Sequence, residues 1–282
     1  MNSSLIVKQS SNKNPTSYYT TGEHLRAKHA LIRNQSGRTI ERWALDLVPT
    51  DPTARILDAG CGWGRFSWPL LESHQLPAAN LVCADVSLGM VQSAVQEGDK
   101  RGRRPHYVNA GIEALPFPAQ QFDGVMANFV LYHVEPLVQG VRELARVLKP
   151  DGWLLVAAHG VMKVLILELH FQALNRLGIH YEREETNPFN LDNGVAILGN
   201  SFGQIERYEF VDEQIYPNAE AFTQSYLTIG GYRSLIARSD ISDEAKTALP
   251  YIFCELAEQV ADERGAIHVP VLMGALICTK PR

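Results

Sequence analysis

The most informative stretch of the sequence is an apolar run that ends in an acid and a glycine-rich turn. It reads Ile56-Leu-Asp-Ala-Gly-Cys-Gly-Trp-Gly-Arg-Phe66, with Asp58 at the end of the apolar run. Glycines lack a Cβ atom, so the backbone can turn tightly and a ligand can lie against it. An acid at the carboxyl end of a strand lies where open α/β sheets bind ligands. The pattern predicts a small-ligand site, and a plain strand-to-helix connector is the alternative.

A second acid follows at the end of the next apolar run, Leu81-Val-Cys-Ala-Asp85. In a doubly wound α/β sheet, an acid at this place accepts hydrogen bonds from ribose hydroxyl groups. The alternative is that Asp85 serves only as a turn or cap residue. Asp58 and Asp85 together predict a ligand that contains a nucleoside.

The spacing of the glycines bears on which nucleoside this is. The dinucleotide fingerprint G-x-G-x-x-G, counted from Gly60, needs its third glycine at position 65. The chain has Arg65 there, and its glycines stand at positions 60, 62 and 64. A nicotinamide-dependent oxidoreductase therefore remains an alternative that the spacing disfavours.

Asp58, Asp85 and the glycine-rich turn can form one site only if strands bring them to the same edge of a sheet. The pattern of the chain predicts such a sheet. Short apolar runs alternate with amphipathic stretches, which predicts βαβ units in a mostly parallel sheet with helices on both faces. The predicted strands are 55–58, 81–85, 107–108, 122–128, 153–158, 205–211 and 267–278. Because the last strand is very apolar, we expect it to be central or well covered.

The chain divides into four expected regions. Residues 1–17 are polar and are expected to form a mobile tail, and 18–50 are expected to form helices that cover the cofactor site. Residues 51–160 are the predicted ligand-binding core. Residues 161–282 are expected to hold the remaining strands, with a helical lid inserted at about 217–265.

Five short motifs then occur in a recognisable order. They are Asp58-Ala-Gly-Cys-Gly-Trp-Gly64, Asp85, Leu115-Pro-Phe117 with Phe122-Asp123, Leu131-Tyr-His133 and Arg146-Val-Leu-Lys-Pro-Asp-Gly152. They resemble the motifs of class I S-adenosylmethionine (SAM) methyltransferases, most closely the type 11 small-molecule subgroup, over about residues 54–160. The resemblance implies a Rossmann-like fold with a mostly parallel seven-stranded sheet and a helical lid. It also implies SAM as the cofactor and S-adenosylhomocysteine as the product.

The resemblance further implies which residues bind the cofactor. Those assigned by position are Gly60, Cys61 and Gly62 facing the methionyl part, Asp85 on the ribose, Val86 and Met90 flanking the adenine, Gly111, Ile112 and Glu113 at the adenine edge, and Asn128 and Phe129 under the methionyl amine. Asp58 and Tyr19 complete the expected set. The acids and backbone dipoles that Asp58, Asp85 and the loop supply suit SAM, which carries a sulfonium cation, an ammonium and a carboxylate but no phosphate.

The chain departs from the family pattern at Gly111. The family often has an Asp there, whose side chain takes the adenine amino group. The backbone N–H of Ile112 could still serve, cofactor affinity could be weaker, or another residue could substitute.

Methyl transfer needs a general base only when the nucleophile must lose a proton. His159, at the end of strand 153–158, and His133, just past strand 122–128, are the candidate bases. A packing or hydrogen-bonding role is the alternative for His133. The aromatic candidates for the substrate wall are Tyr18, Phe189, Phe222, Tyr226 and Tyr232, with core packing as the alternative for each.

Composition excludes several classes. The 282 residues carry a formal charge of −5, with 26 Lys+Arg against 31 Asp+Glu, so no basic excess suggests a nucleic-acid partner. Four cysteines without a CxxC pair, no signal-like segment and no apolar run of membrane-spanning length predict a cytoplasmic protein with no membrane partner. No cluster has metal-ligand spacing, and the sequence leaves the oligomeric state open.

The sequence therefore predicts a SAM-dependent methyltransferase that acts on a small molecule, expected to be a specialised metabolite. O-, N- and C-methylation are not distinguished. The alternative is a SAM-binding protein of the same fold that catalyses a rearrangement or cyclisation, or regulates a partner.

Overall fold

Parallel strands from the first half of the chain form one side of the sheet. The computed structural model describes residues 5–8, 22, 26, 32–49, 51–73, 75–160, 165–182 and 188–282. The parallel strands are β3 (Ile56–Ala59), β4 (Leu81–Asp85), β5 (His106–Asn109), β6 (Phe122–Met126) and β7 (Leu148–His159). Their carboxyl ends meet at one edge, which brings Asp58 and Asp85 to neighbouring strands. The predicted α/β fold is confirmed.

Two long antiparallel strands extend the sheet beyond β7. β10 (Ile267–Pro281) pairs with β7 on one side and with β9 (Phe202–Tyr216) on the other, so the apolar last strand is covered on both edges as expected. β2 (Arg33–Asn34) pairs with the outer edge of β9. The strand order is β2-β9-β10-β7-β6-β3-β4-β5. The sheet thus has eight strands instead of the predicted seven, because a two-residue strand is too short to show a period of two.

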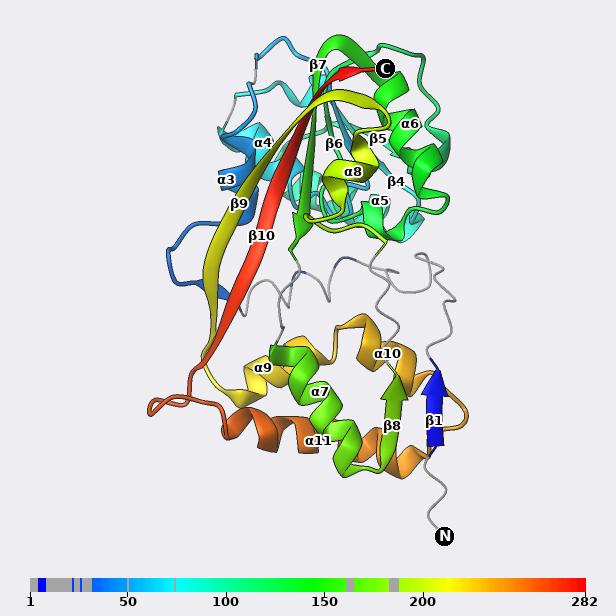
Figure 1. Ribbon diagram of the computed structural model, residues 1–282. Coiled ribbons are helices and arrows are strands. Elements are labelled where there is room, and N and C mark those ends of the chain that lie inside the picture. Colours follow the sequence, from blue (N-terminus) through cyan, green and yellow to red (C-terminus); the bar gives the residue numbers. More distant parts are fainter. Residues whose placement is uncertain are drawn as a thin grey trace.

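Helices pack on both faces of this sheet. α3 (Ile40–Leu45), α4 (Ser67–Ser73) and α5 (Leu88–Lys100) lie along one part of the α/β body, and α6 (Leu137–Val147) and α8 (Gly194–Leu198) along another (Figure 1). Adjacent residues of β3 belong to different cores: Ile56 shares one with Trp68 of α4, and Leu57 shares the other with Leu144 of α6. This alternation gives the doubly wound architecture, in which ligands bind at the carboxyl ends of the strands.

A separate helical part lies beyond one end of the antiparallel pair β9–β10 (Figure 1). This is the end at which β9 finishes with Tyr216 and β10 begins with Ile267. It contains α7 (Leu165–Arg176), and the chain between β9 and β10 supplies α9 (Ala219–Tyr226), α10 (Gly230–Ile236) and α11 (Asp243–Glu258). A small parallel sheet of β1 (Leu5–Lys8) and β8 (Ile179–Glu182) completes it. These helices bury an apolar core of their own, distinct from the cores of the α/β body. Within the described ranges, no helix is long and apolar enough to cross a membrane.

Of the two expected N-terminal regions, only parts are described. Residues 5–8 of the expected tail form β1, and residues 22, 26 and 32–49 of the next region are described, including β2 and α3. Tyr18 and Tyr19 lie outside the described residues.

Candidate functional site

The glycine-rich loop after β3 turns through backbone angles that favour glycine. Gly60 has φ +76° and Gly62 has φ +55°. A Cβ atom on Gly60 would lie 2.4 Å from Cγ2 of Val130, so the glycine-rich loop and the segment that follows β6 approach closely there. Among the described residues, a Cβ atom on Gly62 would meet nothing within 4 Å. Gly62 is therefore where the loop backbone borders open space that a ligand can enter.

The amide groups of this loop are used inside the protein. Gly60 and Cys61 both donate to the carbonyl of Ala84 in β4, at 2.7 and 3.0 Å, and Gly62 donates to Asp85 Oδ2 at 2.8 Å. A phosphate-binding loop instead leaves successive N–H groups free to surround an anion. The amides of Gly60, Cys61 and Gly62 do not form such a set, because each donates to an acceptor inside the protein.

Asp85 stands beside the open side of the loop. Its Oδ2 accepts from Gly62, and its Oδ1 accepts from the amide of Ser87 at 2.9 Å. Burial raises the pKa of Asp85, and the two amide hydrogen bonds oppose that rise. Each carboxylate oxygen keeps a further lone pair that can accept from a ligand hydroxyl.

Asp58 lies one strand away and is almost completely buried, with 2% of its surface exposed. The hydroxyl of Ser67 donates to its Oδ2 at 2.5 Å. Burial raises the pKa of Asp58 to about 7, the Ser67 hydrogen bond opposes this, and the nearby Asp85 charge adds to it. When ionised, two carboxyl groups at adjacent strand ends give this part of the site a negative field, which attracts a cation and repels a phosphate, and a bound cation in turn favours their ionised forms.

Asn128, just after β6, carries an unpartnered donor. Its Oδ1 accepts from the amide of Ala157 in β7 at 2.8 Å, which fixes the orientation of the side-chain amide. The other end, Nδ2, is buried and has no hydrogen-bond partner among the described residues. Such an atom is costly unless a ligand or water accepts from it.

Phe129 follows with a left-handed backbone, φ +52°, and its amide donates to the carbonyl of Ala157 at 2.8 Å. Its ring centroid lies 4.8 Å from that of His159, and the guanidinium of Arg65 lies 4.9 Å from the same ring. Arg65 also forms an ion pair with Glu41 of α3. A non-glycine residue in this conformation is uncommon and is concentrated at functional sites.

The two candidate bases lie on different elements. His159 is exposed at the end of β7, against Phe129. His133 ends the 3-10 helix η3 (Leu131–His133), where its ring lies 4.3 Å from that of Tyr132. His159 thus has the more direct contact with the residues at the end of β6.

The turn after β5 forms the other end of the site. Asn109 Nδ2 donates to the carbonyls of Asp85 and Val86, at 2.8 and 2.9 Å, and so joins the ends of β5 and β4. Val86 is 43% exposed, whereas Met90, in the first turn of α5, is buried. Residues Gly111, Ile112 and Glu113 follow Asn109 and begin the 3-10 helix η2 (Ile112–Ala114).

The aromatic residues expected at a substrate wall do not lie together. Phe189 packs in the core of the α/β body. Phe222 and Tyr226 are fully buried in the helical part, where Tyr226 stacks on Phe253 at 3.8 Å. Tyr232, 4.9 Å from Tyr226, keeps partial exposure. Apolar periodicity marks a buried ring, but it does not say whether protein or substrate covers that ring.

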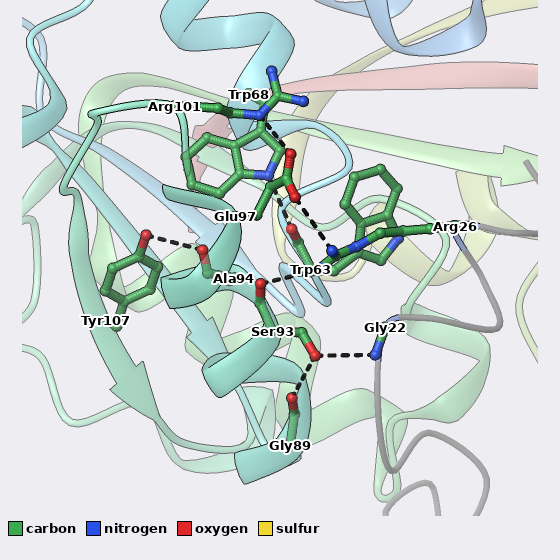
Figure 2. A network of polar contacts seen from close by, with 10 residues as sticks. All are labelled: Gly22, Arg26, Trp63, Trp68, Gly89, Ser93, Ala94, Glu97, Arg101 and Tyr107. Carbon is green, nitrogen blue, oxygen red and sulfur yellow. Dashed lines mark hydrogen bonds and ion pairs between the residues drawn. The ribbon is translucent and has the colours of Figure 1, made fainter. Parts of the chain in front are cut away.

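Figure 2 shows a contact that sequence reasoning missed, between the N-terminal region and the glycine-rich loop. Gly22 N donates to Ser93 Oγ at 3.0 Å, and Arg26 donates to the Ser93 carbonyl at 3.0 Å and pairs with Glu97 at 3.2 Å. The Arg26 guanidinium lies 5.3 Å from the ring centre of Trp63, the neighbour of Gly62. No local sequence signal joins these segments, since tertiary packing alone brings Arg26 to α5.

Comparisons with known proteins agree with this geometry. Residues 57–156 match a family of methyltransferase domains, type 11. A malonyl-acyl-carrier-protein O-methyltransferase of Methylovorus sp. is 36% identical over 135 residues, which cover 46% of this chain and 44% of the relative. A demethylmenaquinone methyltransferase of Beutenbergia cavernae is 35% identical over 120 residues, or 43% of this chain and 47% of the relative. The chain thus spans less than half the length of each of these two curated relatives.

Among solved structures, the 4+2 cyclase SpnF has the same fold. Its TM-score is 0.57 at 15% identity, and the alignment covers 98% of this chain and 99% of that one. The fold and the site together define a class I, Rossmann-like methyltransferase fold. Within that class the chain carries a methyltransferase domain of type 11 at residues 57–156, and SAM is the cofactor of this domain.

The residues present fit that cofactor. Asp85 offers acceptors for ribose hydroxyls, the two acids suit the positive charges, and Asn128 Nδ2 offers a buried donor that needs an acceptor. In the part of the chain that is described, no group of three or more His, Cys, Asp or Glu could hold a metal ion.

Proposed function

We propose that this protein transfers the methyl group of SAM to a small-molecule acceptor, a specialised metabolite, in the cytoplasm. The observation that carries the proposal is the bond from Gly62 to Asp85. It joins the loop to the acid in a site that lacks a phosphate cradle and has a second acid, Asp58, beside it. That combination suits a nucleoside with a positive charge and no phosphate better than a dinucleotide.

Each residue has a defined part in binding. Asp85 accepts from the ribose hydroxyls, and the open side of Gly62 admits the methionyl chain. Asn128 donates to the methionyl carboxylate, which satisfies the buried Nδ2 atom. Asp58 and Asp85 supply the negative field that favours the sulfonium and ammonium charges. When bound, SAM supplies a methyl group that is already activated for transfer.

His159 is the proposed general base for an acceptor that must lose a proton. It stands exposed at the end of β7, and Phe129 packs against its ring. The ring nitrogen would take the proton of the attacking group as the new bond forms. The Arg65 guanidinium, 4.9 Å from the centre of the Phe129 ring, helps to hold the Phe129 ring in place. His133 is the second candidate.

Two features lead us to propose a small acceptor. The net charge disfavours a nucleic-acid acceptor, and the helical part favours a closed site. The net charge of −5 gives no basic excess for a nucleic acid, and the helical part at the far end of the β9–β10 hairpin is available to complete an acceptor pocket. Tyr18, Tyr19 and Tyr232 remain proposed contacts of this pocket or of the cofactor. The two relatives named above are methyltransferases with different acceptors in their names, so the shared core does not identify the acceptor.

The second candidate is a reaction that does not consume SAM, or a regulatory role. A 4+2 cyclase has this fold, and fold alone does not fix the chemistry. Consumption of SAM separates the two. A methyltransferase forms one S-adenosylhomocysteine per product, whereas a cyclase returns SAM unchanged.

Calorimetric titration of the purified protein with SAM, S-adenosylhomocysteine and NADH tests the cofactor. Micromolar binding of both adenosyl ligands without binding of NADH supports the proposal. Incubation with a panel of small acceptors and methyl-labelled SAM then tests transfer. Binding of NADH alone would overturn the proposal.

A further inference from the structure

Arg65, just after the glycine-rich loop, uses only one of its three guanidinium nitrogens inside the protein. Its Nε donates to Glu41 of α3 in an ion pair. Among the described residues, Nη1 and Nη2 of Arg65 have no hydrogen-bond partner, and neither atom is buried. The side chain as a whole is 24% exposed. The N–H groups of the Nη edge are therefore available to a ligand.

Arg146 shows how the same protein places an arginine that only supports the fold. Its Nε and Nη2 donate to Glu143 at 2.6 and 2.8 Å. Its Nη1 donates to the carbonyl of Phe117 at 2.8 Å, and Nη2 also donates to the carbonyl of Leu115 at 3.1 Å. All three nitrogens are used, although this side chain is 36% exposed, more than that of Arg65. Support of α3 through Nε therefore does not account for the open Nη edge of Arg65.

The guanidinium of Arg65 lies beside the proposed site of transfer. It is 4.9 Å from the centre of the Phe129 ring, and the ring of His159 is 4.8 Å from the same centre. Phe129 directly follows Asn128, the proposed donor to the methionyl carboxylate. An acceptor whose reacting group faces His159 therefore lies against Phe129, and Arg65 is within the length of a small molecule from that group.

The Phe129 ring also adjoins an apolar cluster at the end of β7. The members of the cluster are the buried Ile40, Phe210 and Met273, with the partly buried Trp43, Phe129 and Val271 packed against them. Met273 lies opposite His159 in the pairing of β10 with β7, which places the cluster beside the proposed base. An apolar surface next to an open guanidinium edge suits a ligand that has an apolar frame and an anionic end.

We infer that the Nη edge of Arg65 binds a carboxylate of the methyl acceptor, so that the acceptor is a small organic acid with an apolar frame. The inference rests on the proposed function and names the substrate class of the same site. The planar fork of a guanidinium donates two parallel hydrogen bonds to a carboxylate, whereas a neutral amide offers one acceptor oxygen. The bound cofactor adds a positive sulfonium, which attracts the same carboxylate. Arg65 is thus a specificity-determining residue.

Binding of carboxylates and of their neutral amides tests this without any turnover. The probes are benzoate against benzamide and hexanoate against hexanamide, titrated by calorimetry into the protein saturated with S-adenosylhomocysteine. We expect at least one carboxylate to bind at least about tenfold more tightly than its amide. Arg65→Gln is expected to abolish that preference, and Arg65→Lys, which keeps the charge but not the fork, should retain only part of it. Affinity for S-adenosylhomocysteine should stay close to that of the unsubstituted protein in both variants.

Glu41→Gln is the matched control. It removes the same ion pair, but its amide oxygen can still accept from Nε, and the Nη edge of Arg65 stays in place, so the preference for the carboxylate should remain. An equal loss of preference in Glu41→Gln and Arg65→Gln would assign Arg65 to the support of α3 and overturn the inference. Equal binding of each carboxylate and its amide, or binding of neither carboxylate, would also overturn it. Failure of the unsubstituted protein to bind S-adenosylhomocysteine would instead overturn the proposed function, and this inference with it.

Discussion

The backbone amide of Gly62 donates to Asp85 Oδ2 at 2.8 Å, so the glycine-rich loop and the acid at the end of β4 form one unit. The loop contributes its open side to the ligand, and the acid contributes acceptors. Because the same carboxylate binds both the loop and the proposed ribose, a change at Asp85 acts on both.

Asp85→Ala is expected to weaken binding of S-adenosylhomocysteine about 10- to 100-fold, the scale of hydrogen bonds to a charged group. Asp85→Asn keeps one acceptor oxygen and should lose less. Calorimetry measures both, with Asp151→Ala, an exposed acid, as the control. Unchanged affinity in a folded Asp85→Ala variant would remove Asp85 from the cofactor site.

His159→Ala is expected to lower methyl transfer by about 10²-fold or more for an acceptor that must lose a proton, as for loss of a general base. Its affinity for S-adenosylhomocysteine should stay within about threefold. His106→Gln, at an exposed residue of β5, is the control, and His133→Ala tests the second candidate. Normal turnover of His159→Ala with saturating acceptor would reject His159 as the base.

Asp58→Asn is expected to change how stability depends on pH. Burial raises the pKa of Asp58 to about 7 in the folded protein, whereas an unfolded Asp titrates near about 3.9. The folded state therefore holds a proton that the unfolded state releases, and the free energy of unfolding falls as pH rises from about 4 through 7. Asn cannot ionise, and its oxygen can still accept from Ser67.

Urea unfolding at pH 5 and pH 8 measures this effect. Asp58→Asn should be more stable than the unsubstituted protein at pH 8, by a few kcal/mol at most, and the difference should shrink at pH 5. Asp151→Asn should follow the unsubstituted protein at both pH values. Equal pH slopes for Asp58→Asn and the unsubstituted protein would show that Asp58 titrates normally.

Arg26→Met is expected to weaken binding of S-adenosylhomocysteine about two- to tenfold. The substitution removes the pairing with Glu97 and the contact with Trp63 but keeps an apolar stem. Because Trp63 adjoins Gly62, looser packing there should reach the loop. Arg104→Met, whose side chain is 84% exposed, is the control. Full affinity in Arg26→Met would separate the N-terminal region from cofactor binding.

Much of the α/β body could be predicted from the sequence. Each predicted strand has its counterpart from β3 onward, because short apolar runs bounded by turns carry a local signal. The eighth strand, β2, was missed because its two residues gain their extended pairing only from β9. The type 11 motifs also identified the domain, since a glycine-rich turn and a strand-end acid need only neighbouring residues to be recognisable.

The positions of most side chains could not be predicted in this way. Phe222 and Tyr226 were candidates for a substrate wall, and the structure buries both against Phe253. Arg65 was noticed only as a departure from the dinucleotide fingerprint, yet it packs over Phe129. In each case the partner comes from a distant segment, which a local pattern does not specify.

The sequence by itself determined which segments form strands along the chain, where the glycine-rich loop lies, and which acids stand at strand ends. These features can be predicted because backbone conformation and apolar periodicity depend on near neighbours. Only the tertiary structure decided that Glu113 folds over Gly111, that Arg26 lies against Trp63, and that the buried Asn128 Nδ2 has no partner in the described part of the chain. The direction and burial of a side chain are set by close packing of segments far apart in the chain.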